Sequence, residues 1–323
     1  MYRKWRIPQD KVFSYPQKSI CSGGKKFQKM TLYKAWLAKS PMLRRLMTQV
    51  KTAQTHSQGM APPMARSFGV VNWMGLATLY KKEVRRFMKV FPQTLLAPII
   101  SNLLFMTVFV LAFAEQRGGG SPEFIKFLAP GLVMLGILNN AAANSSSSMM
   151  TSKMNGSVID VLMPPLSYYE LALGYIGGAM TRGIVVAIAT ALALSVFFTP
   201  LIPIHWWAVI YFSLSAAAAM AMIGTLSGIW AEKFDQLAVV NQFIILPLSY
   251  LSGTFYHIDI LPTIFQKISL ANPLFYLIDG FRYGFLGEAD GNVITGAIMI
   301  AVINIILFWV VLRVLKSGWR LKA

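Results

Sequence analysis

Six long apolar segments occupy most of the chain from residue 94 onward, and they constrain the fold more than any other feature. About 20 apolar residues in a helix suffice to cross the hydrocarbon core of a bilayer. Charged residues make up only 13% of the sequence, whereas a typical soluble domain holds about a quarter. We therefore predict an all-α membrane protein with six transmembrane helices. The predicted spans cover residues 94–114, 124–150, 171–198, 206–230, 237–253 and 293–312.

The Lys and Arg residues of the connecting segments predict the orientation of the spans. If the N-terminus is inside, the inside segments hold most of these cations and the outside loops hold few. Cytoplasmic loops carry such an excess, so we expect both termini in the cytoplasm. The inside cations would be Lys81, Lys82, Arg85, Arg86, Lys89, Lys153, Lys233, Lys316, Arg320 and Lys322, and the outside ones Arg117, Lys267 and Arg282.

The first 72 residues are basic and show little apolar periodicity. We predict that residues 1–72 form a basic, disordered extension and that 73–323 form the transmembrane domain. Three interpretations of the extension stay open: a cytoplasmic tail, an addition upstream of a true start at Met60, Met64 or Met74, or a targeting segment. Its partner would be anionic lipid and not nucleic acid, because no basic domain with interleaved aromatic residues accompanies the charge.

Residues 74–91 show helical spacing of apolar side chains just before the first predicted span. Basic side chains take the other face of this helix. An amphipathic helix of this kind should lie in the membrane interface, and an ordinary positive flank of the span is the alternative. The basic face consists of Lys81, Lys82, Arg85, Arg86 and Lys89.

The sequence holds no motif for energy conversion or catalysis. It contains no G-x-x-x-x-G-K-[ST] loop, no H-E-x-x-H and no G-x-S-x-G. The single cysteine, Cys21, excludes a disulfide framework and a cysteine-based metal site. Glu170 and Asp235, both at span ends, are the only acids that could carry a coupling ion. We therefore predict no catalytic, cofactor-binding or metal-binding residue, and we disfavour an ion-driven carrier and a self-contained pump.

The inside loop between the second and third spans covers residues 151–169. Residues 154–165 predict a helix of about two turns, closed by Pro164 and Pro165. A short rigid helix tied to two spans suits the transmission of force from a partner, and a plain interfacial loop is the alternative. The apolar face would be Val158, Val161 and Leu162, with Lys153 and Asp160 as polar residues.

The outside connection, residues 254–292, is too apolar for a free loop and too interrupted by proline and glycine for a span. We predict a pair of short helices that dip back into the outer leaflet. Asn272 is a natural helix N-cap and Pro273 a natural first helical residue. Asp279 and Arg282 share a helix face and can form an ion pair. This helix would be either a capped structural element or part of the substrate path.

Polar residues also occur inside the second and third spans. Such groups must find partners within a membrane, so they either join helices or line a hydrated path. The candidate residues for a translocation path are Asn139, Asn140, Asn144 and Arg182.

The C-terminal part of the chain carries a family likeness. The run Leu251-Ser-Gly-Thr-Phe-Tyr256, then Leu261-Pro262, then Asn272-Pro273-Leu274-x-Tyr276-x-x-Asp279-x-x-Arg282, resembles the signature of the membrane subunits of type-2 ABC exporters, the ABC-2 family. The loop from Gly156 to Ser167 is similar to the family's coupling-helix region, and 74–91 is similar to its interface helix. His257 stands where the family often has proline, and residues 1–72 have no counterpart in the family pattern.

The resemblance implies a half-size permease of the bacterial inner membrane. Two copies would form the pore, and a separate ABC ATPase, which binds ATP and Mg²⁺, would dock on the 151–169 loops. The substrate would be amphipathic, lipid-linked or drug-like. The implied coupling residues are Lys153, Gly156, Val158, Asp160, Val161, Leu162 and Pro165, and the motif and exit residues are Gly253, Phe255, Pro262, Asn272, Pro273, Tyr276, Asp279 and Arg282.

Two other functions compete with export. A membrane scaffold or assembly protein would need the spans but no coupling loop. An enzyme acting on lipid-linked substrates would need clustered His, Asp or Glu in the membrane, and the predicted spans lack such a cluster.

Overall fold

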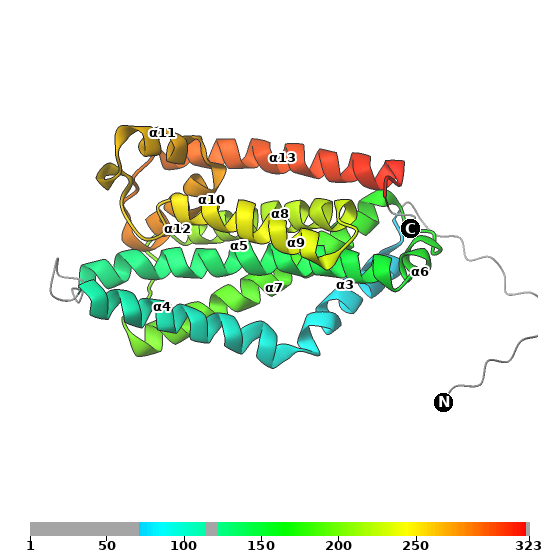
Figure 1. Ribbon diagram of the computed structural model, residues 1–323, viewed down its shortest axis with the longest axis horizontal. Helices are drawn as coiled ribbons and strands as arrows, with labels where there is room; N and C mark the ends of the chain where they lie inside the picture. Colours follow the sequence, from blue (N-terminus) through cyan, green and yellow to red (C-terminus); the bar gives the residue numbers. More distant parts are fainter. Residues whose placement is uncertain (1–70, 114–121, 321–323) are drawn as a thin grey trace, which may run out of the picture. The chain divides into compact units, whose positions relative to one another are not determined.

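The computed structural model describes residues 71–113 and 122–320, and all regular structure in these ranges is helical (Figure 1). The predicted N-terminal extension lies outside the described residues, except for its last two. The elements are α3 Trp73–Met88, η1 Pro92–Leu96, α4 Ala97–Phe113, α5 Pro122–Met154, α6 Val158–Leu162, α7 Tyr168–Phe197, α8 Trp206–Trp230, α9 Phe234–Val240, η2 Asn241–Ile245, α10 Leu246–Leu251, η3 Ile258–Ile260, α11 Thr263–Ala271, α12 Pro273–Leu286 and α13 Val293–Ser317.

Six helical runs in the described ranges are long and apolar enough to cross a membrane, which confirms the predicted number of spans. The first combines η1 with α4, and the fifth combines α9, η2 and α10. The fourth matches its predicted bounds, whereas the sixth continues past residue 312. The runs are Pro92–Ala112, Pro122–Met154, Tyr168–Phe197, Trp206–Trp230, Phe234–Leu251 and Val293–Ser317.

The first and fifth spans each contain a π-helical turn next to a proline. Pro92 begins η1, and Pro247 is the second residue of α10. Proline has no N–H to complete the hydrogen-bond ladder, so the helix adjusts its winding locally. These two spans are also mostly uncovered by other helices, since only 17% of the apolar window of each is buried.

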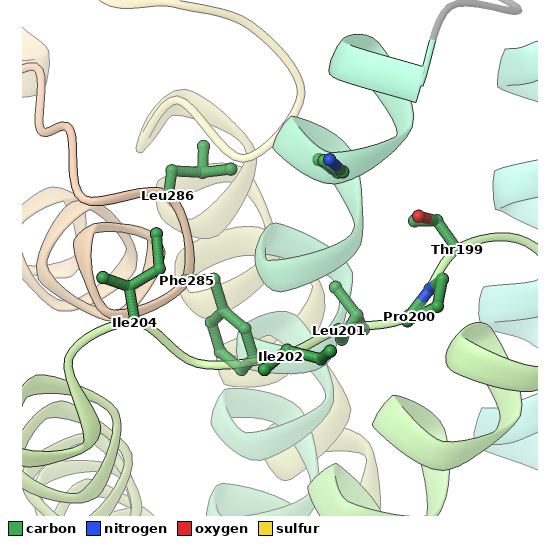
Figure 2. A pocket seen from close by; sticks show the side chains of 8 residues that line it. Thr199, Pro200, Leu201, Ile202, Ile204, Phe285 and Leu286 are labelled. Atoms are coloured by element: carbon green, nitrogen blue, oxygen red, sulfur yellow. The ribbon is translucent and has the colours of Figure 1, made fainter.

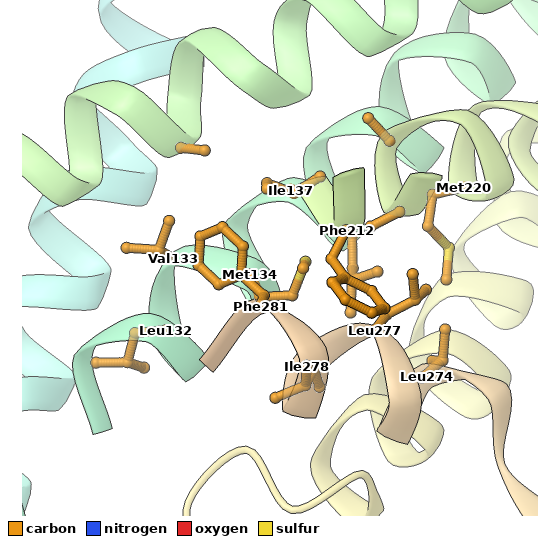
Figure 3. Packing of buried hydrophobic residues seen from close by; sticks show 14 of the residues in the cluster. Leu132, Val133, Met134, Ile137, Phe212, Met220, Leu274, Leu277, Ile278 and Phe281 are labelled. Atoms are coloured by element: carbon orange, nitrogen blue, oxygen red, sulfur yellow. The ribbon is translucent and has the colours of Figure 1, made fainter. Parts of the chain in front are cut away.

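The central helix is α5, whose apolar window is 78% buried. It packs against α7, α8 and α12. Figure 3 shows Leu132 and Ile137 of α5 in the cluster that also contains Phe212 of α8 and Phe281 of α12. In lipid, such helices associate through close packing, because the lipid tails are as apolar as the side chains.

Helix α3 packs closely along α7 because α7 presents glycine on the shared face. A Cβ atom on Gly174 would lie 2.5 Å from the side chain of Leu79, and one on Gly178 would lie 2.5 Å from that of Glu83. Larger residues would push the two helices apart. One face of α3 is therefore covered by protein and not by lipid headgroups.

Glu170 joins the start of α3 to the start of α7. Its Oε2 accepts a hydrogen bond of 2.7 Å from the backbone N–H of Ser167, whose hydroxyl accepts one from Glu170 N–H, which forms a capping box. Its Oε1 accepts from the backbone N–H of Asn72 at 2.5 Å. Asn72 in turn caps α3. This acid at a span end thus caps and joins helices.

Figure 1 shows α6 and the C-terminal end of α13 at one end of the bundle, and α11 at the other. The two helices predicted between the fifth and sixth spans are present as α11 and α12. Helix α12 packs against α5, α8 and α13. One end of the bundle therefore holds the predicted coupling loop, and the other holds the connection between the last two spans.

Candidate functional site

A polar cavity of about 590 Å³ lies between α3, the first span, α5, α7 and α10. This volume falls in the range of about 300–1,000 Å³ that is typical of small-molecule pockets. Four residues singled out from the sequence line it: Arg86, Asn139, Asn140 and Arg182. Its other polar lining residues are Gln93, Thr94, Ser101, Asn102, Ser147 and Tyr250, and its apolar ones are Val90, Ala97, Pro98, Phe105, Leu135 and Gly136.

Arg182 lies near the middle of α7 and is half-buried. Its Nη2 donates to Oδ1 of Asn140 at 3.2 Å, while its Nε has no hydrogen-bond partner among the described residues. It also forms no ion pair with any residue of the described part of the chain. A charge at this depth is costly, so it marks a functional site or a hydrated cavity.

Arg86 reaches the same cavity from the end of α3. Its Nη2 donates to the backbone oxygen of Asn144 at 2.6 Å and to Oδ1 of the same residue at 2.9 Å, and its Nη1 donates to Ser147 Oγ at 3.2 Å. Its Nε lies 3.4 Å from a carboxylate oxygen of Glu83, which is fully buried. The assignment of Arg86 to the interfacial face of this helix is therefore wrong.

The physical reason is the i, i+3 spacing of Glu83 and Arg86, which places both on the side of α3 that meets the bundle. Lys81, Lys82 and Arg85 are exposed, as the amphipathic pattern predicted. The sequence did contain one signal that Arg86 differs from its neighbours: Glu83, an acid inside the run of cations, lies three residues before it. The helix also ends at Met88 and not at residue 91.

The residues in the polar stretch of α5 differ in what they contact. Asn139 is half-buried on the cavity wall, with no side-chain hydrogen bond to the described residues. Asn144 is fully buried behind the wall and holds Arg86. The hydroxyls of Ser145 and Ser146 donate to backbone carbonyl groups of α5 itself. The stretch thus combines cavity-lining amides with groups that hold or pack helices.

The predicted coupling helix is shorter than the range 154–165. Helix α5 continues to Met154, and Gly156 takes a left-handed φ of 67°, so α6 begins only at Val158 and ends at Leu162. Glycine adopts this conformation without steric cost because it has no Cβ. The predicted bounds are therefore wrong at both ends.

The predicted apolar face of α6 packs against the protein. Val158 is buried and Val161 packs against a buried cluster, so this apolar face points into the protein. Ile159 and Met163 are 64% and 77% exposed, and the sequence analysis did not single them out. Asp160 and Pro165 are exposed as well, while the side chain of Leu162 lies outside the described part.

Lys153 joins α5 to the end of α8. Its Nζ donates to the backbone oxygens of Ile229 and Ala231 at 2.7 and 2.6 Å. A cation at a helix C-terminus satisfies carbonyl groups that have no partner in the helix. Lys153 therefore stabilises the base of the loop.

The motif residue Arg282 is 2% exposed and has partners on several sides, although its Nε has no hydrogen bond to the described residues. Its Nη2 donates to the backbone oxygen of Gly253 at 2.7 Å, and its guanidinium carbon lies 3.7 Å from the ring centroid of Phe127. The carboxylate nearest to it, at 3.9 Å from Nη1, is that of Asp290. The predicted ion pair with Asp279 is therefore wrong. Burial lowers the pKa of Arg282 to about 10, and the two nearby carboxylates oppose this effect.

Asp279 holds the loop before α13. Its two carboxylate oxygens accept the backbone N–H groups of Asp290 and Gly291 at 2.9 and 3.0 Å. Burial raises the pKa of Asp279, and the two N–H donors and the nearby Arg282 oppose that rise. Together, Asp279, Arg282 and Asp290 form what we call the outer charged cluster, named for the outside position that the sequence predicts for residues 254–292.

The other motif residues cap and pack helices. Asn272 caps α12, as predicted, by accepting from Leu274 N–H at 3.0 Å, and Pro273 is the first helical residue. Tyr276 packs against Gly296 of α13. Phe255 stacks on Phe109 with ring centroids 5.1 Å apart, and Pro262 directly precedes α11.

A second cavity, of about 440 Å³, lies between α5, the 199–204 segment and the end of α12. Figure 2 shows its wall, which is formed largely by Leu201, Ile202, Phe285 and neighbouring apolar side chains. Lys126 is the single charged residue among the described residues that line it. Among residues 71–113 and 122–320, no three His, Cys, Asp or Glu side chains are grouped to hold a metal ion.

The described helices define a multi-pass membrane protein with a polar site among its spans. The pattern of the ABC-2 type transporter family matches residues 74–286. The inner membrane transport permease YadH of Escherichia coli K12 is 34% identical over 253 residues, which cover 78% of this chain and 98% of that protein. Nodulation protein J of Rhizobium leguminosarum bv. viciae is 24% identical over 236 residues, covering 70% and 86%.

The chain belongs to the ABC-2 type transporter family, as its sequence motifs indicated. It is a multi-pass protein of the bacterial inner membrane. The family and the permease relative indicate a membrane transport permease and not an enzyme.

Proposed function

We propose that this chain is the permease subunit of an ATP-driven exporter, in which a separate ABC ATPase binds ATP and Mg²⁺. The chain supplies the path for an amphipathic, lipid-linked or drug-like substrate. The observation that carries the proposal is the polar cavity among the spans of a chain from the ABC-2 type transporter family. The E. coli relative, named as a transport permease, supports the same assignment.

The cavity favours transport over a scaffold role. An arginine at the centre of a span costs about 2.5–3.5 kcal/mol on insertion scales. Arg182 carries this cost without an ion pair in the described part of the chain, and Asn139 presents its amide to the cavity. A scaffold protein would gain little from such groups, whereas a substrate path uses them.

The end of the bundle that carries α6 supports docking of the ATPase. Ile159 and Met163 present exposed apolar side chains there, next to the exposed Asp160. The loop is tied to α7, whose capping box includes Glu170, and it directly continues α5. Because α5 and α7 both line the cavity, a push on α6 would reach two of its walls.

The proposed orientation places both termini in the cytoplasm. Six spans return the chain to the side on which it began, and the exposed cations of α3 suit lipid headgroups on the cytoplasmic side. Helices α11 and α12 would then lie on the outside as re-entrant elements that shape the exit.

A homodimer completes the proposed path. The cavity walls formed by α4 and α10 belong to the first and fifth spans, which the other helices leave mostly uncovered. Exposed apolar side chains on these spans include Ile100, Leu104 and Phe243. A second copy that packs on them would cover the open side of the cavity.

The test is reconstitution of the full chain in proteoliposomes with an ABC ATPase that co-purifies with it. We expect the permease to stimulate ATP hydrolysis and to move substrate only with ATP. The double change Ile159→Glu and Met163→Glu should reduce ATPase association about tenfold or more, because it places charge on an apolar contact. The matched control, Ile159→Leu with Met163→Leu, should associate normally. Failure to associate with any ABC ATPase, or unchanged association of the Glu variant, would overturn the assignment.

A further inference from the structure

We propose that the polar cavity is an oxyanion site, which selects amphipathic substrates whose headgroup carries a phosphate or carboxylate. The inference rests on the proposed function, because it names the chemical class of substrate that the path accepts. It goes beyond that function because neither the spans nor the docking loop distinguish an anionic substrate from a neutral or cationic one.

The charges around the cavity do not balance. Arg86 and Arg182 both line it, and no Asp or Glu of the described residues does. Among residues 71–113 and 122–320, the carboxylate that pairs with either arginine is that of Glu83, which lies behind Arg86 and does not line the cavity. The two guanidinium groups and this one carboxylate leave an excess of one positive charge. In a membrane, such an excess is stabilised by water or by a bound anion.

The two arginines differ in how firmly the protein holds them. Both terminal nitrogens of Arg86 donate to α5, through Asn144 and Ser147. Arg182 donates to the described residues only once, through Nη2 to Asn140, and it has no ion pair there, whereas Arg86 also has Glu83 beside it. The Nε of each arginine is buried and has no hydrogen bond in the described part. Arginine matches the oxygens of phosphate and carboxylate in a two-point geometry. Arg182 is therefore the main anion-binding group, and Arg86 adds a fixed positive charge.

The rest of the wall suits an amphipathic molecule. Asn139 and Gln93 offer amides that can bind the polar part of a headgroup. Phe105 and Leu135 give the same cavity an apolar wall, and α4 carries exposed apolar residues such as Leu104. An anionic headgroup at Arg182 can thus keep its tail against the first span. A cationic headgroup would meet two arginines of like charge.

The test is equilibrium binding of radiolabelled dodecyl phosphate to the full chain in neutral phosphatidylcholine nanodiscs. Dodecyl phosphate and laurate should compete for the site, whereas dodecanol and dodecyltrimethylammonium should compete at least tenfold more weakly. Inorganic phosphate forms the second arm: weak competition identifies an amphiphile site, and competition equal to that of dodecyl phosphate identifies a site for free phosphate. Either source retains the oxyanion assignment.

The variants separate charge from structure. Arg182→Gln should weaken dodecyl phosphate binding about tenfold or more, and Arg182→Lys, which keeps the charge but loses the two-point geometry, should weaken it less. Arg86→Gln should also weaken dodecyl phosphate binding, and it is the second variant to measure if Arg182→Gln does not fold. The matched control is Arg313→Gln, since Arg313 is an exposed arginine of another span. Equal binding of all variants, or equal competition by the cationic amphiphile, would overturn the inference.

The binding assay needs neither ATP nor the ATPase, so the two proposals can fail separately. Charge-dependent binding without ATP-driven export would overturn the proposed function and leave the anion site. ATP-driven export that is the same for Arg182→Gln and wild type, together with unchanged binding, would overturn the anion site and leave the permease.

Discussion

Arg282 and Arg182, both in the described part of the chain, are withdrawn from the surface in environments that differ in most of their contacts. Arg282 in the outer charged cluster is 2% exposed, donates to a backbone carbonyl, stacks on an aromatic ring and has a carboxylate nearby. Arg182 is half-buried on a cavity wall, with one hydrogen bond and no ion pair to the described residues. The first arginine is enclosed by the fold, whereas the second faces open volume.

Under the proposed function, this difference separates a structural charge from a substrate-binding one. A buried charge with several partners in the protein holds elements together, and removing it leaves those partners unsatisfied. A charge inside a span that has few partners adds little to the fold and costs desolvation, which makes it a candidate for binding. The comparison predicts opposite effects on stability for the same type of substitution.

The largest expected effect is that of Arg282→Ala. The change leaves the Gly253 carbonyl without its donor and the carboxylates of Asp279 and Asp290 without a nearby cation. Breaking a buried charged pair costs about 3–5 kcal/mol, which corresponds to a fall in melting temperature of roughly 10 °C. Thermal unfolding of the purified full chain in detergent, followed by tryptophan fluorescence, measures it. Arg313→Ala is the matched control, and equal melting of both variants would contradict a structural role for Arg282.

The sequence predicted the spans well, because each is a long apolar run whose length is set by the bilayer. It also predicted the Asn272 cap, which depends on residues that are adjacent in the chain. It failed where the partner of a side chain lies far along the sequence. Asp279 and Arg282 are close on one helix, but each found its partner in segments that only the fold brings near.

The same limit explains which residues of the candidate site were predicted from the sequence and which were not. Asn139, Asn140 and Arg182 were predicted because polar residues within apolar runs are conspicuous. Arg86 was placed on the wrong face, because a cation in a basic helix looks like its neighbours until packing against α5 is known. The exposed side of α6 could not be predicted either, since its start depends on how far α5 continues.

A smaller effect, of opposite sign, is expected for Arg182→Met. Methionine fills similar volume without charge, and replacing a charge that has no ion pair in a span removes its desolvation cost. The melting temperature should stay constant or rise by a few degrees, while ATP-driven export should fall about tenfold or more. Melting and transport are measured on one preparation. A loss of stability comparable to that of Arg282→Ala would show that Arg182 is structural and would remove the contrast between the two sites.

The smallest effect concerns pH and the outer charged cluster. Burial raises the folded-state pKa of Asp279 above its ordinary value of 3.8, so the folded protein holds this proton more tightly than the unfolded one. The resulting stability is fully present below that value and is lost as pH rises through the raised pKa. The melting temperature of the wild type, relative to Asp279→Asn, should therefore increase as pH falls from about 7 to about 4. The neighbouring His257 and Asp290 are the same in both proteins, so the difference isolates the contribution of Asp279. If the difference stays constant or shrinks on acidification, the two backbone donors stabilise the ionised carboxylate of Asp279 enough to offset its burial. The outer charged cluster would then hold Asp279 in its ionised form.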